Sequence, residues 1–463
     1  MSAAQVLSAD QMRAAEQTLF ESGTNVSELM EVAAGGAAEW IRRVAAGRSV
    51  TVLCGPGNNG GDGYVIARLL RDSGNAVKVI APLEPTTDAA KEARRRWNGP
   101  VVTADDGAGG NIFVDCLFGS GLTRPLVAEH VLLLRDLAAQ HRFRVAVDVP
   151  SGIASDTGAL LNGDLPVYDL TLVLGAWKFA HWRLPGRAMM GQLRLVPICI
   201  GAVEGAAQLV ERPKIAPPAS ESHKYRRGLL GIVAGGMPGA SLLAAAAAQR
   251  AGAGYVKLLA RTADPRTPAD VVTDTAPLAQ SLTDPRIAAL LIGPGLGRDG
   301  AAKAALGEAL RHAKALVLDA DALGLLAPNM LARDFPMLAT PHDGELETLC
   351  RTFGVIAEGR QARAQALAKV TGMVVLAKGP DSLVAAPDGR LALGTPAPSW
   401  LSVAGTGDVL AGIAASRMAT GADPFTAACE ALWLHGEAAR RAGPAFTPSQ
   451  LAERVSEALA AAL

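Results

Sequence analysis

The chain is poor in aromatic residues and carries no excess of either charge. Phe, Trp and Tyr together make up 4% of its 463 residues, and 44 Lys and Arg residues balance 44 Asp and Glu residues. Proteins that bind single-stranded nucleic acid stack bases on aromatic side chains, and proteins that bind anionic polymers or membranes present a positive surface. The composition therefore predicts a protein with no nucleic acid partner and no membrane partner.

Cysteine is also scarce. The chain has five cysteines, Cys54, Cys116, Cys199, Cys350 and Cys429, which are widely spaced and form no C-x-x-C pair. An odd number of scattered cysteines suggests neither a disulfide framework nor a zinc site. No basic flank followed by an apolar region occurs in the first sixteen residues, so the sequence predicts no secretory signal. We expect free thiols and a cytoplasmic location.

One run without charge, residues 228–249, is long enough to cross a bilayer. Gly235-Gly236-Met237-Pro238-Gly239 interrupts this run. Glycine and proline at that density break a helix, so we expect a strand, a glycine-rich turn and an alanine-rich helix instead of a membrane span.

The length exceeds that of one ordinary hydrophobic core, which predicts two domains. Short apolar runs alternate with helical patterns in both halves, and this alternation predicts an α/β fold of two three-layer αβα domains. The first domain should be a Rossmann-like doubly wound sheet. The expected strands are 50–54, 77–80, 112–117, 145–149, 170–174 and 193–197, and then 229–234, 256–260, 289–292, 316–319, 337–340 and 374–378.

Local signals add boundaries to this outline. Ser8 and Gln11 form a capping box that predicts the start of a helix over 9–22, and a second helix is expected over 26–44. Residues 211–220 are rich in proline and charge, so we interpret them as the linker between domains 1–210 and 220–463. Residues 387–390 predict a hairpin turn.

The densest polar motif is Gly57-Asn58-Asn59-Gly60-Gly61-Asp62-Gly63, between the strand 50–54 and a helical pattern over 64–71. Glycines let the backbone approach a ligand closely, and the N–H groups of a helix start attract anions. Residues 55–60 also fit G-x-G-x-x-G, but the next expected strand ends in Ala81-Pro82 without the acid that would hold a ribose. We therefore interpret the turn as the site of a charged small molecule, with or without a cation.

Polar residues also follow three other expected strands of the first domain. They are Asp115 with residues 119–125, Asp148 with residues 149–152, and Lys178 after Gly175-Ala176-Trp177. Ligands of parallel sheets bind beyond the carboxyl ends of the strands, so these groups predict one site. A lone Asp in such a place is commonly a helix cap or a buried structural carboxylate, but four groups at one edge favour a site.

These motifs, in this order, resemble the NAD(P)H-hydrate epimerases of the YjeF N-terminal family over roughly residues 1–205. The resemblance implies interconversion of the R and S epimers at C6 of hydrated NADH and NADPH (NADHX and NADPHX), with a bound potassium ion. It implies that potassium is held by Asn59, Asp115 and Ser151. The substrate contacts that it implies are Asn58, Asn59, Gly60, Gly61, Asp62, Gly119, Ser120, Gly121, Leu122, Thr123, Arg124, Pro125 and Asp148.

The residue types suit that chemistry. Potassium prefers carbonyl, amide, hydroxyl and carboxylate oxygens, which this motif set supplies. Inverting C6 requires proton transfer near its hydroxyl and stabilisation of a cationic ring, and a positioned carboxylate can do both. We expect Asp148 to be this catalytic residue.

In the second domain the strongest motif is Ala404-Gly405-Thr406-Gly407-Asp408, which enters a helical pattern from Val409. Small residues at a helix start expose N–H groups to phosphate oxygens. An Asp beside them can accept a proton from a hydroxyl that attacks phosphorus. The same Asp would also be an ordinary helix cap.

With residues 235–241, 293–297, 318–323, 340–345 and 377–382, this motif resembles the ribokinase-like NAD(P)H-hydrate dehydratases over roughly 220–460. The resemblance implies dehydration of the S epimer to NAD(P)H at the expense of ADP, or of ATP in some members, giving AMP and phosphate from ADP. It implies Mg²⁺, Asp408 as the catalytic base, and substrate contacts from Ser241, Gly295, His342 and Asp408. The implied nucleotide contacts are Lys378, Gly379, Pro380, Asp381, Ser382, Gly405 and Gly407.

The sequence departs from this family in two places. A stretch rich in Gly and Asn is usual shortly before G-x-G-D, and here residues 394–401 read Gly-Thr-Pro-Ala-Pro-Ser-Trp-Leu. Gly324 stands where many members have Asn. The resemblance thus predicts a bifunctional repair enzyme but leaves open the choice between ADP and ATP, the choice between NADHX and NADPHX, and whether the chain forms a homo-oligomer.

Two other functions remain open from the residues alone. In the first alternative, the second domain is a vitamin or sugar kinase on the same scaffold, which releases a phosphorylated product. The first domain would be a binding module without turnover.

Overall fold

A computed structural model describes residues 4–104, 109–331 and 334–463. The chain divides into two compact units, Met1–Ala207 and Gln208–Leu463, and each is described by itself. The division lies a few residues before the segment 211–220 that we predicted as the linker, and that segment contains no helix or strand. Across the described ranges, no helix combines the length and the apolar character needed to span a bilayer.

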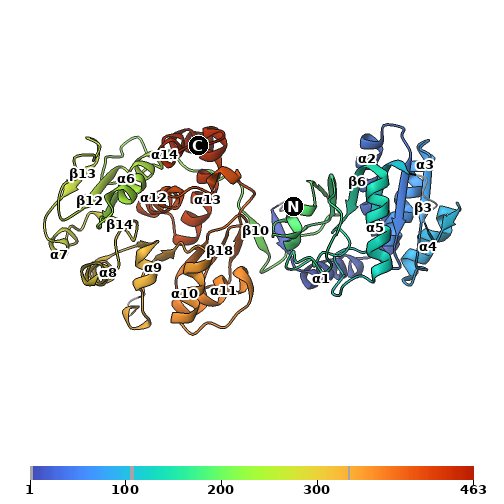
Figure 1. The fold of residues 1–463 in the computed structure, drawn as a ribbon, viewed down its shortest axis with the longest axis horizontal. Coiled ribbons are helices and arrows are strands. Elements are labelled where there is room, and N and C mark those ends of the chain that lie inside the picture. Colours follow the sequence, from blue (N-terminus) through green and yellow to red (C-terminus); the bar gives the residue numbers. More distant parts are fainter. Residues whose placement is uncertain (1–3, 105–108, 332–333) are drawn as a thin grey trace. The chain divides into compact units, whose positions relative to one another are not determined.

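The first unit is built on a parallel seven-stranded sheet of order β4-β3-β2-β5-β6-β7-β9 (Figure 1). The strands are β2 (Val50–Cys54), β3 (Val77–Ile80), β4 (Val101–Val102), β5 (Gly110–Cys116), β6 (His141–Val147), β7 (Leu170–Leu174) and β9 (Gln192–Val196). A short parallel pair, β1 (Gln5–Leu7) and β8 (Trp177–Lys178), lies outside this sheet. Because β2 has its sequence successors β3 and β5 on opposite sides, the strand order reverses there, which is where doubly wound sheets bind ligands.

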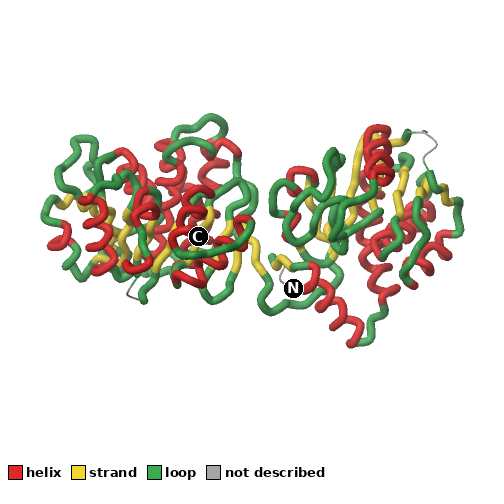
Figure 2. Tube along the Cα trace, turned by 60° about the horizontal axis from the view of Figure 1, so that its bottom comes forward, coloured by secondary structure: helices red, strands yellow, loops and turns green. Residues whose placement is uncertain are grey.

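Helices cover both faces of this sheet, as expected for three layers (Figure 2). The helices are α1 (Ala9–Glu21), α2 (Val26–Ala45), α3 (Asn58–Asp72), α4 (Asp88–Trp97) and α5 (Ala128–Gln140). Side chains alternate along β2: Val50 and Val52 pack with α2 and α3, whereas Leu53 packs with Leu134 and Leu137 of α5. The predicted capping box of Ser8 and Gln11 is present at the start of α1.

The second unit contains a sheet of order β13-β12-β11-β14-β15-β16-β17-β18-β19-β10. Its parallel strands are β11 (Leu229–Val233), β12 (Tyr255–Leu259), β13 (Val272–Asp274), β14 (Ile287–Ile292), β15 (Leu316–Leu318), β16 (Met337–Ala339) and β17 (Val374–Ala377). The antiparallel strands β18 (Leu383–Ala385) and β19 (Leu391–Leu393) form the predicted hairpin, and β10 (Ala207–Leu209) pairs with β19.

Helices α6, α12, α13 and α14 pack an alanine-rich core against one face of this sheet, and α8 to α11 lie on its opposite face (Figure 1). Small side chains allow this close approach: a Cβ atom on Gly412 of α12 would lie 2.2 Å from the Ala244 carbonyl oxygen of α6. The helices are α6 (Pro238–Arg250), α7 (Leu278–Ser281), α8 (Gly300–His312), α9 (Asp321–Leu325), α10 (Asp343–Thr352), α11 (Gly359–Thr371), α12 (Thr406–Ala419), α13 (Pro424–Ala442) and α14 (Pro448–Ala462). Short 3₁₀ turns cover Phe179–His181, Gly186–Met189, Pro328–Met330 and Ser399–Leu401.

The predicted α/β class, the two αβα units and the main strands are confirmed, and residues 228–249 form β11, a turn and α6 as expected. The helix starts differ from the prediction. We expected helical patterns from Tyr64 and from Val409, but α3 begins at Asn58 and α12 begins at Thr406. Glycine and asparagine have low helix propensity, which concealed the first turn of both helices.

Candidate active sites

The first candidate site is a cavity of about 530 Å³ beyond the carboxyl ends of β2, β5 and β6. Polar groups from five segments of the chain meet there. The lining includes Glu16, Asn58, Asn59, Asp62, Gly119, Ser120, Gly121, Leu122, Thr123, Arg124, Asp148 and Lys178. Most of the residues predicted to contact the epimerase substrate line this cavity, whereas Gly60, Gly61 and Pro125 do not.

Gly60 explains why the motif needs glycine at its centre. A Cβ atom at this position would lie 1.9 Å from the carbonyl oxygen of Gly55, closer than any side chain can come. The glycine thus lets the first turn of α3 pack on the loop after β2. As a result, Asn58, Asn59 and Asp62 all stand on the first turns of one helix, at the cavity.

Asp148 and Lys178 form a buried ion pair. Lys178 Nζ lies 2.5 Å from Asp148 Oδ1, the two residues are 1% and 7% exposed, and Ser120 N–H donates to Asp148 Oδ2 at 3.1 Å. Burial raises the pKa of Asp148, but Lys178 and Ser120 outweigh burial and hold that pKa below its ordinary value. Asp148 is therefore ionised at neutral pH. Its backbone φ is 67°, which is left-handed and uncommon for a residue with a side chain.

His181 fixes the backbone of Asp148. Its Nε2 lies 2.8 Å from the Asp148 carbonyl oxygen, and its Nδ1 accepts from the N–H of Lys178. Burial lowers the pKa of His181 to about 4. The ring is therefore neutral at pH 7 and positions both members of the ion pair.

Two further carboxyl groups share this cavity. Burial raises the pKa of Asp62 well above its ordinary value, and the charges of Asp148 and Glu16 raise it further, against the opposing effect of Lys178. Burial also raises the pKa of Glu16. The cavity thus combines a carboxyl group whose pKa is lowered, Asp148, with one whose pKa is raised, Asp62.

The residues expected to hold potassium meet around the loop after β5. Asp115 accepts from Leu117 N–H, from Ser151 N–H and Oγ, and from Tyr168 Oη, while Ser151 Oγ also accepts from Phe118 N–H. A Cβ atom on Gly119 would lie 3.1 Å from the amide carbon of Asn59. Both the amide oxygen and the amide nitrogen of Asn59 are buried without a hydrogen-bond partner. A buried oxygen without a donor is a suitable ligand for a cation.

The second unit has its own carboxylate site, at the start of α12. Gly405, with φ 99°, turns the chain into the helix, and Asp408 follows on its first turn. Burial raises the pKa of Asp408 to about 6, with a further contribution from the charge of Asp319 and an opposing one from Lys378. At pH 7 the carboxylate is ionised and more basic than an ordinary Asp, as a general base requires.

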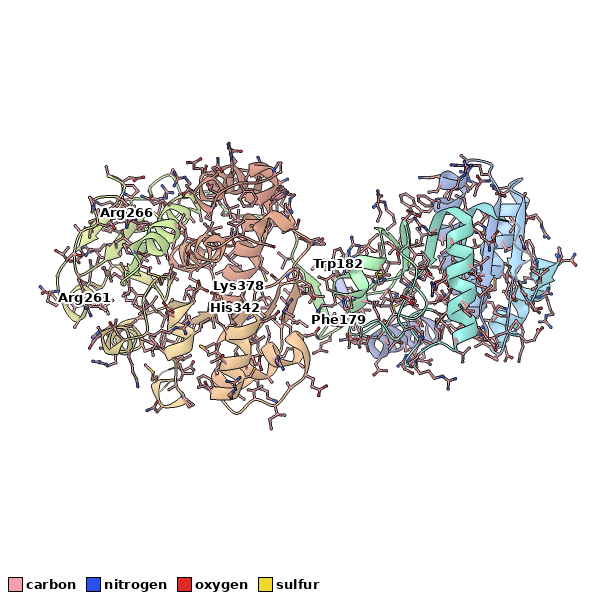
Figure 3. All side chains as sticks on the ribbon, in the orientation of Figure 1. Phe179, Trp182, Arg261, Arg266, His342 and Lys378 are labelled. Carbon is pink, nitrogen blue, oxygen red and sulfur yellow. The ribbon has the colours of Figure 1, made fainter. Side chains whose placement is uncertain are left out.

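Lys378 forms an ion pair with Asp319 in this site. Its Nζ donates to Asp319 Oδ1 at 2.6 Å, and Thr340 Oγ1 donates to the same oxygen at 2.7 Å. These residues follow β17, β15 and β16, so the carboxyl edge of the sheet brings them together. Lys378 also pairs through its backbone with His342, which lies next to it in Figure 3.

A cavity of about 440 Å³ opens beside Lys378. Of the residues expected to contact the nucleotide, Lys378, Gly379, Pro380, Ser382 and Gly407 line it, together with His342. Asp381 does not line it, since Asp381 is buried and pairs with Arg360. The unusual segment 394–401 lines the same cavity through residues such as Thr395 and Pro398, so the departure from the family pattern falls at this cavity.

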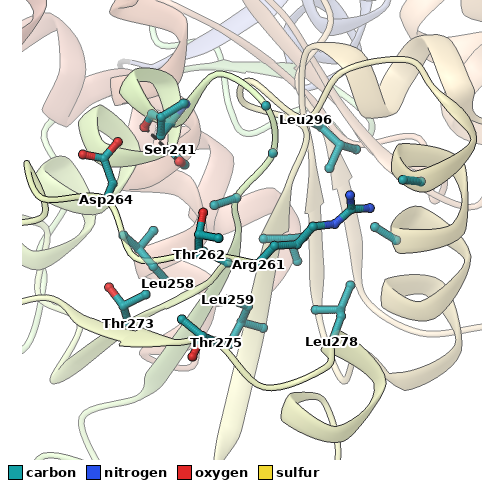
Figure 4. Close-up of a pocket in the computed structure, with 18 of the residues that line it drawn as sticks. Ser241, Leu258, Leu259, Arg261, Thr262, Asp264, Thr273, Thr275, Leu278 and Leu296 are labelled. Carbon is teal, nitrogen blue, oxygen red and sulfur yellow. Dashed lines mark hydrogen bonds between the residues drawn. The ribbon is translucent and has the colours of Figure 1, made fainter.

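A larger cavity of about 880 Å³ lies at the ends of β11, β12, β13 and β14 (Figure 4). Ser241, Gly235 and Gly236 line it, and Gly295 supports it: a Cβ atom on Gly295 would lie 2.2 Å from the Met237 carbonyl oxygen. The expected substrate contacts therefore divide between the two cavities, because Ser241 lines this one and His342 the smaller one.

Comparison with known proteins matches each unit to a family. The family described as YjeF-related protein N-terminus matches residues 26–180, and the family described as NAD(P)H-hydrate dehydratase matches residues 230–461. A bifunctional NAD(P)H-hydrate repair enzyme of Salinibacter ruber is 34% identical over 96% of this chain and 93% of its own length. The Escherichia coli enzyme of the same description is 34% identical over 93% of this chain and 88% of its own length.

The chain belongs to the family of bifunctional NAD(P)H-hydrate repair enzymes. The resemblance that the motifs suggested is thereby confirmed in both units. The chain also resembles a crystal structure described as ADP/ATP-dependent NAD(P)H-hydrate dehydratase from Bacillus subtilis, co-crystallised with ATP and Mg²⁺. The two are 27% identical, with 53% of this chain and 93% of that chain covered and a TM-score of 0.46.

Several residues of the two candidate sites were not predicted from the sequence. Glu16 lies four residues after the buried Met12 on α1, so an acid on the apolar face of that helix was the available signal. No local pattern in the sequence indicates Tyr168 or His181. Their hydrogen-bond partners, Asp115 and Asp148, lie far away in the sequence. Asp319 was visible only as part of a strand-end motif.

Proposed function

We propose that the first unit epimerises NADHX and NADPHX at C6 and that the second unit dehydrates the S epimer at the expense of a nucleotide. The observation that carries this proposal is that each unit has its own carboxylate site beside a cavity, at the carboxyl edge of its own sheet. Family membership over both units supports the pairing of these two activities. A cytoplasmic location, where NAD(P)H is abundant, accords with five cysteines that form no disulfide.

For epimerisation we assign Asp62 as the proton donor and Asp148 as the ionised partner. Two carboxyl groups whose surroundings shift their pKa values apart are suited to acid and base roles. Protonated Asp62 donates to the C6 hydroxyl, which leaves as water, while the lone pair of the ring nitrogen stabilises the cation. Asp148 stabilises that cation by its charge. Water then adds to the opposite face of C6, and its surplus proton returns to Asp62.

We assign Asn59, Asp115 and Ser151 as the residues that would hold a potassium ion. The buried amide oxygen of Asn59 has no donor, and with Asp115 and Ser151 it would hold the ion through oxygen atoms. The ion would supply a positive charge that offsets the buried carboxylate of Asp115. The three residues would then fix the loop that carries Gly119 and Ser120.

For dehydration we assign the smaller cavity of the second unit to ADP, or to ATP, and Asp408 to the role of base. Asp408 accepts the proton of the C6 hydroxyl as its oxygen attacks the terminal phosphorus of ADP, and AMP leaves. The C6–O bond then breaks with loss of a proton from C5, which gives NAD(P)H and phosphate. Gly407 and Lys378 line the cavity where the phosphates would lie. Mg²⁺ would neutralise the charge of these phosphates.

The test incubates the R and S mixture of hydrated NADPH with the full chain, ADP, Mg²⁺ and K⁺. Recovery of NADPH absorbance follows dehydration, and chromatography follows the two epimers. The variant Asp408→Asn should lose dehydration and retain epimerisation. Dehydration that persists in this variant would contradict the assignment, and release of a phosphorylated small molecule instead of NADPH would favour the kinase alternative.

A further inference from the structure

The 880 Å³ cavity of the second unit contains a lining cation without an anionic partner among the described residues. Arg261, which follows β12, lines this cavity, and its guanidinium reaches across it in Figure 4. No carboxylate of residues 4–104, 109–331 or 334–463 forms an ion pair with Arg261. Arg266, five residues later, is paired with Asp264 and does not line the cavity.

Each acidic residue of the same cavity has a partner within the protein. Asp264 accepts two hydrogen bonds from the Arg266 guanidinium, at 3.0 and 2.7 Å. Asp299 caps α8 by accepting from the N–H of Ala302. Glu308 pairs with Arg311 at 2.8 Å. Among the described charged residues of the lining, Arg261 is therefore the one for which neither a hydrogen bond nor an ion pair is found.

The rest of the lining suits a nucleotide. Leu258, Leu259 and Leu278 supply apolar surface on which a base can pack, and Thr262, Thr273 and Thr275 supply hydroxyl groups (Figure 4). Ligand cavities of this kind combine an apolar lining with a few polar groups that fix orientation. The cavity also extends to Ser241, a proposed contact of the hydrated nicotinamide.

We propose that Arg261 binds a phosphate of the ADP half of the hydrated dinucleotide, and that this cavity holds that half. The inference rests on the proposed dehydratase function and adds the part of the substrate that this cavity recognises. A planar guanidinium donates two parallel hydrogen bonds to phosphate oxygens, so it both anchors and orients the group. The phosphate is either the 2′-phosphate, which only NADPHX carries, or the diphosphate common to both substrates.

The first experiment measures KM for dehydration of the S epimers of NADPHX and NADHX by Arg261→Gln. Loss of a hydrogen bond to a charged group predicts a rise in KM of about tenfold to a hundredfold. A rise for NADPHX alone supports the 2′-phosphate as the partner, and an equal rise for both substrates supports the diphosphate. No rise for either substrate overturns the proposal. Arg454→Gln, which removes the same charge from an exposed position on α14, is the matched control.

The second experiment does not depend on turnover. Adenosine 2′,5′-bisphosphate and ADP-ribose are titrated calorimetrically into the wild-type chain, Arg261→Gln and Arg454→Gln, after thermal unfolding has shown that all three are folded. Weaker binding of either probe to Arg261→Gln than to Arg454→Gln supports the proposal, even if the chain dehydrates neither hydrate. Equal binding to the three proteins overturns it, even if dehydration is intact.

Discussion

Lys178 donates a hydrogen bond of 2.5 Å to Asp148, and both side chains are buried at the edge of the first sheet. The second unit repeats this relationship with Lys378 and Asp319 at 2.6 Å. In each unit a second carboxyl group with a raised pKa belongs to the same site, Asp62 in the first and Asp408 in the second. The charge of Asp148 helps to raise the pKa of Asp62, and the charge of Asp319 helps to raise the pKa of Asp408.

The rate of dehydration should rise with pH through about 6. The pKa of Asp408 is raised to about 6, and only its ionised form can accept the proton of the C6 hydroxyl. The measurement is a pH profile of kcat/KM for the S epimer from pH 5 to pH 8. A profile that is flat over this range would contradict the role of Asp408 as the base.

Asp408→Asn should stabilise the second unit at neutral pH while it abolishes dehydration. A carboxyl group whose pKa is raised on folding destabilises the fold at pH values above its folded pKa, and this penalty disappears below its unfolded pKa. Allowing for solvent screening at a partly exposed group, we expect a gain of about 1–2 kcal/mol at pH 7.5 that vanishes near pH 4. Denaturant unfolding at both pH values tests this.

The control for that experiment is Asp388→Asn. The pKa of Asp388 is lowered by the backbone N–H of Arg390 and by its guanidinium, so its removal should bring no gain at neutral pH. An equal gain in both variants would show that the effect does not come from the buried site.

Asp62→Asn and Asp148→Asn should lower epimerisation for different reasons. Because burial raises the pKa of Asp62, its replacement by the neutral Asn should not lower stability, but it should reduce the rate by about 10²–10⁴-fold. Asp148→Asn leaves the Lys178 ammonium buried without its partner and should cost about 3–5 kcal/mol of stability as well. Epimer exchange and urea unfolding are measured on both variants.

The double variant Asp148→Asn with Lys178→Met tests whether the unpaired Lys178 ammonium causes the loss of stability in Asp148→Asn. It should recover much of the lost stability but no epimerisation, because it removes the unpaired charge without restoring a carboxylate. A near wild-type epimerisation rate in Asp62→Asn would exclude Asp62 as the proton donor.

Potassium should affect the first unit alone. We expect removal of K⁺ to slow epimerisation and to leave dehydration of the pure S epimer unchanged, since Asn59, Asp115 and Ser151 all belong to the first unit. Asn59→Ala should require a K⁺ concentration about ten to a hundred times higher for the same activation. Activation by K⁺ that is equal in Asn59→Ala and wild type would exclude Asn59 as a ligand.

The family and the α/β class follow from the amino-acid sequence alone, which also predicts the loops that would form the sites. Apolar runs such as Val50–Cys54 have a period and length that predict buried parallel strands, and strand ends are where such sheets bind ligands. Gly60 could be recognised as a position where the backbone must come close, although not that it lies inside the first turn of α3.

The contacts between these residues, in contrast, are visible only in the tertiary structure. Lys178 and Asp148 are 30 positions apart and Lys378 and Asp319 are 59 apart, so no local pattern shows either ion pair. A pKa depends on burial and on the charges nearby in space, which is why the opposite pKa shifts of Asp62 and Asp148 could not be predicted from the motif. The separation of Ser241 from His342 into two cavities likewise follows from the order of the strands in the sheet and not from their order in the chain.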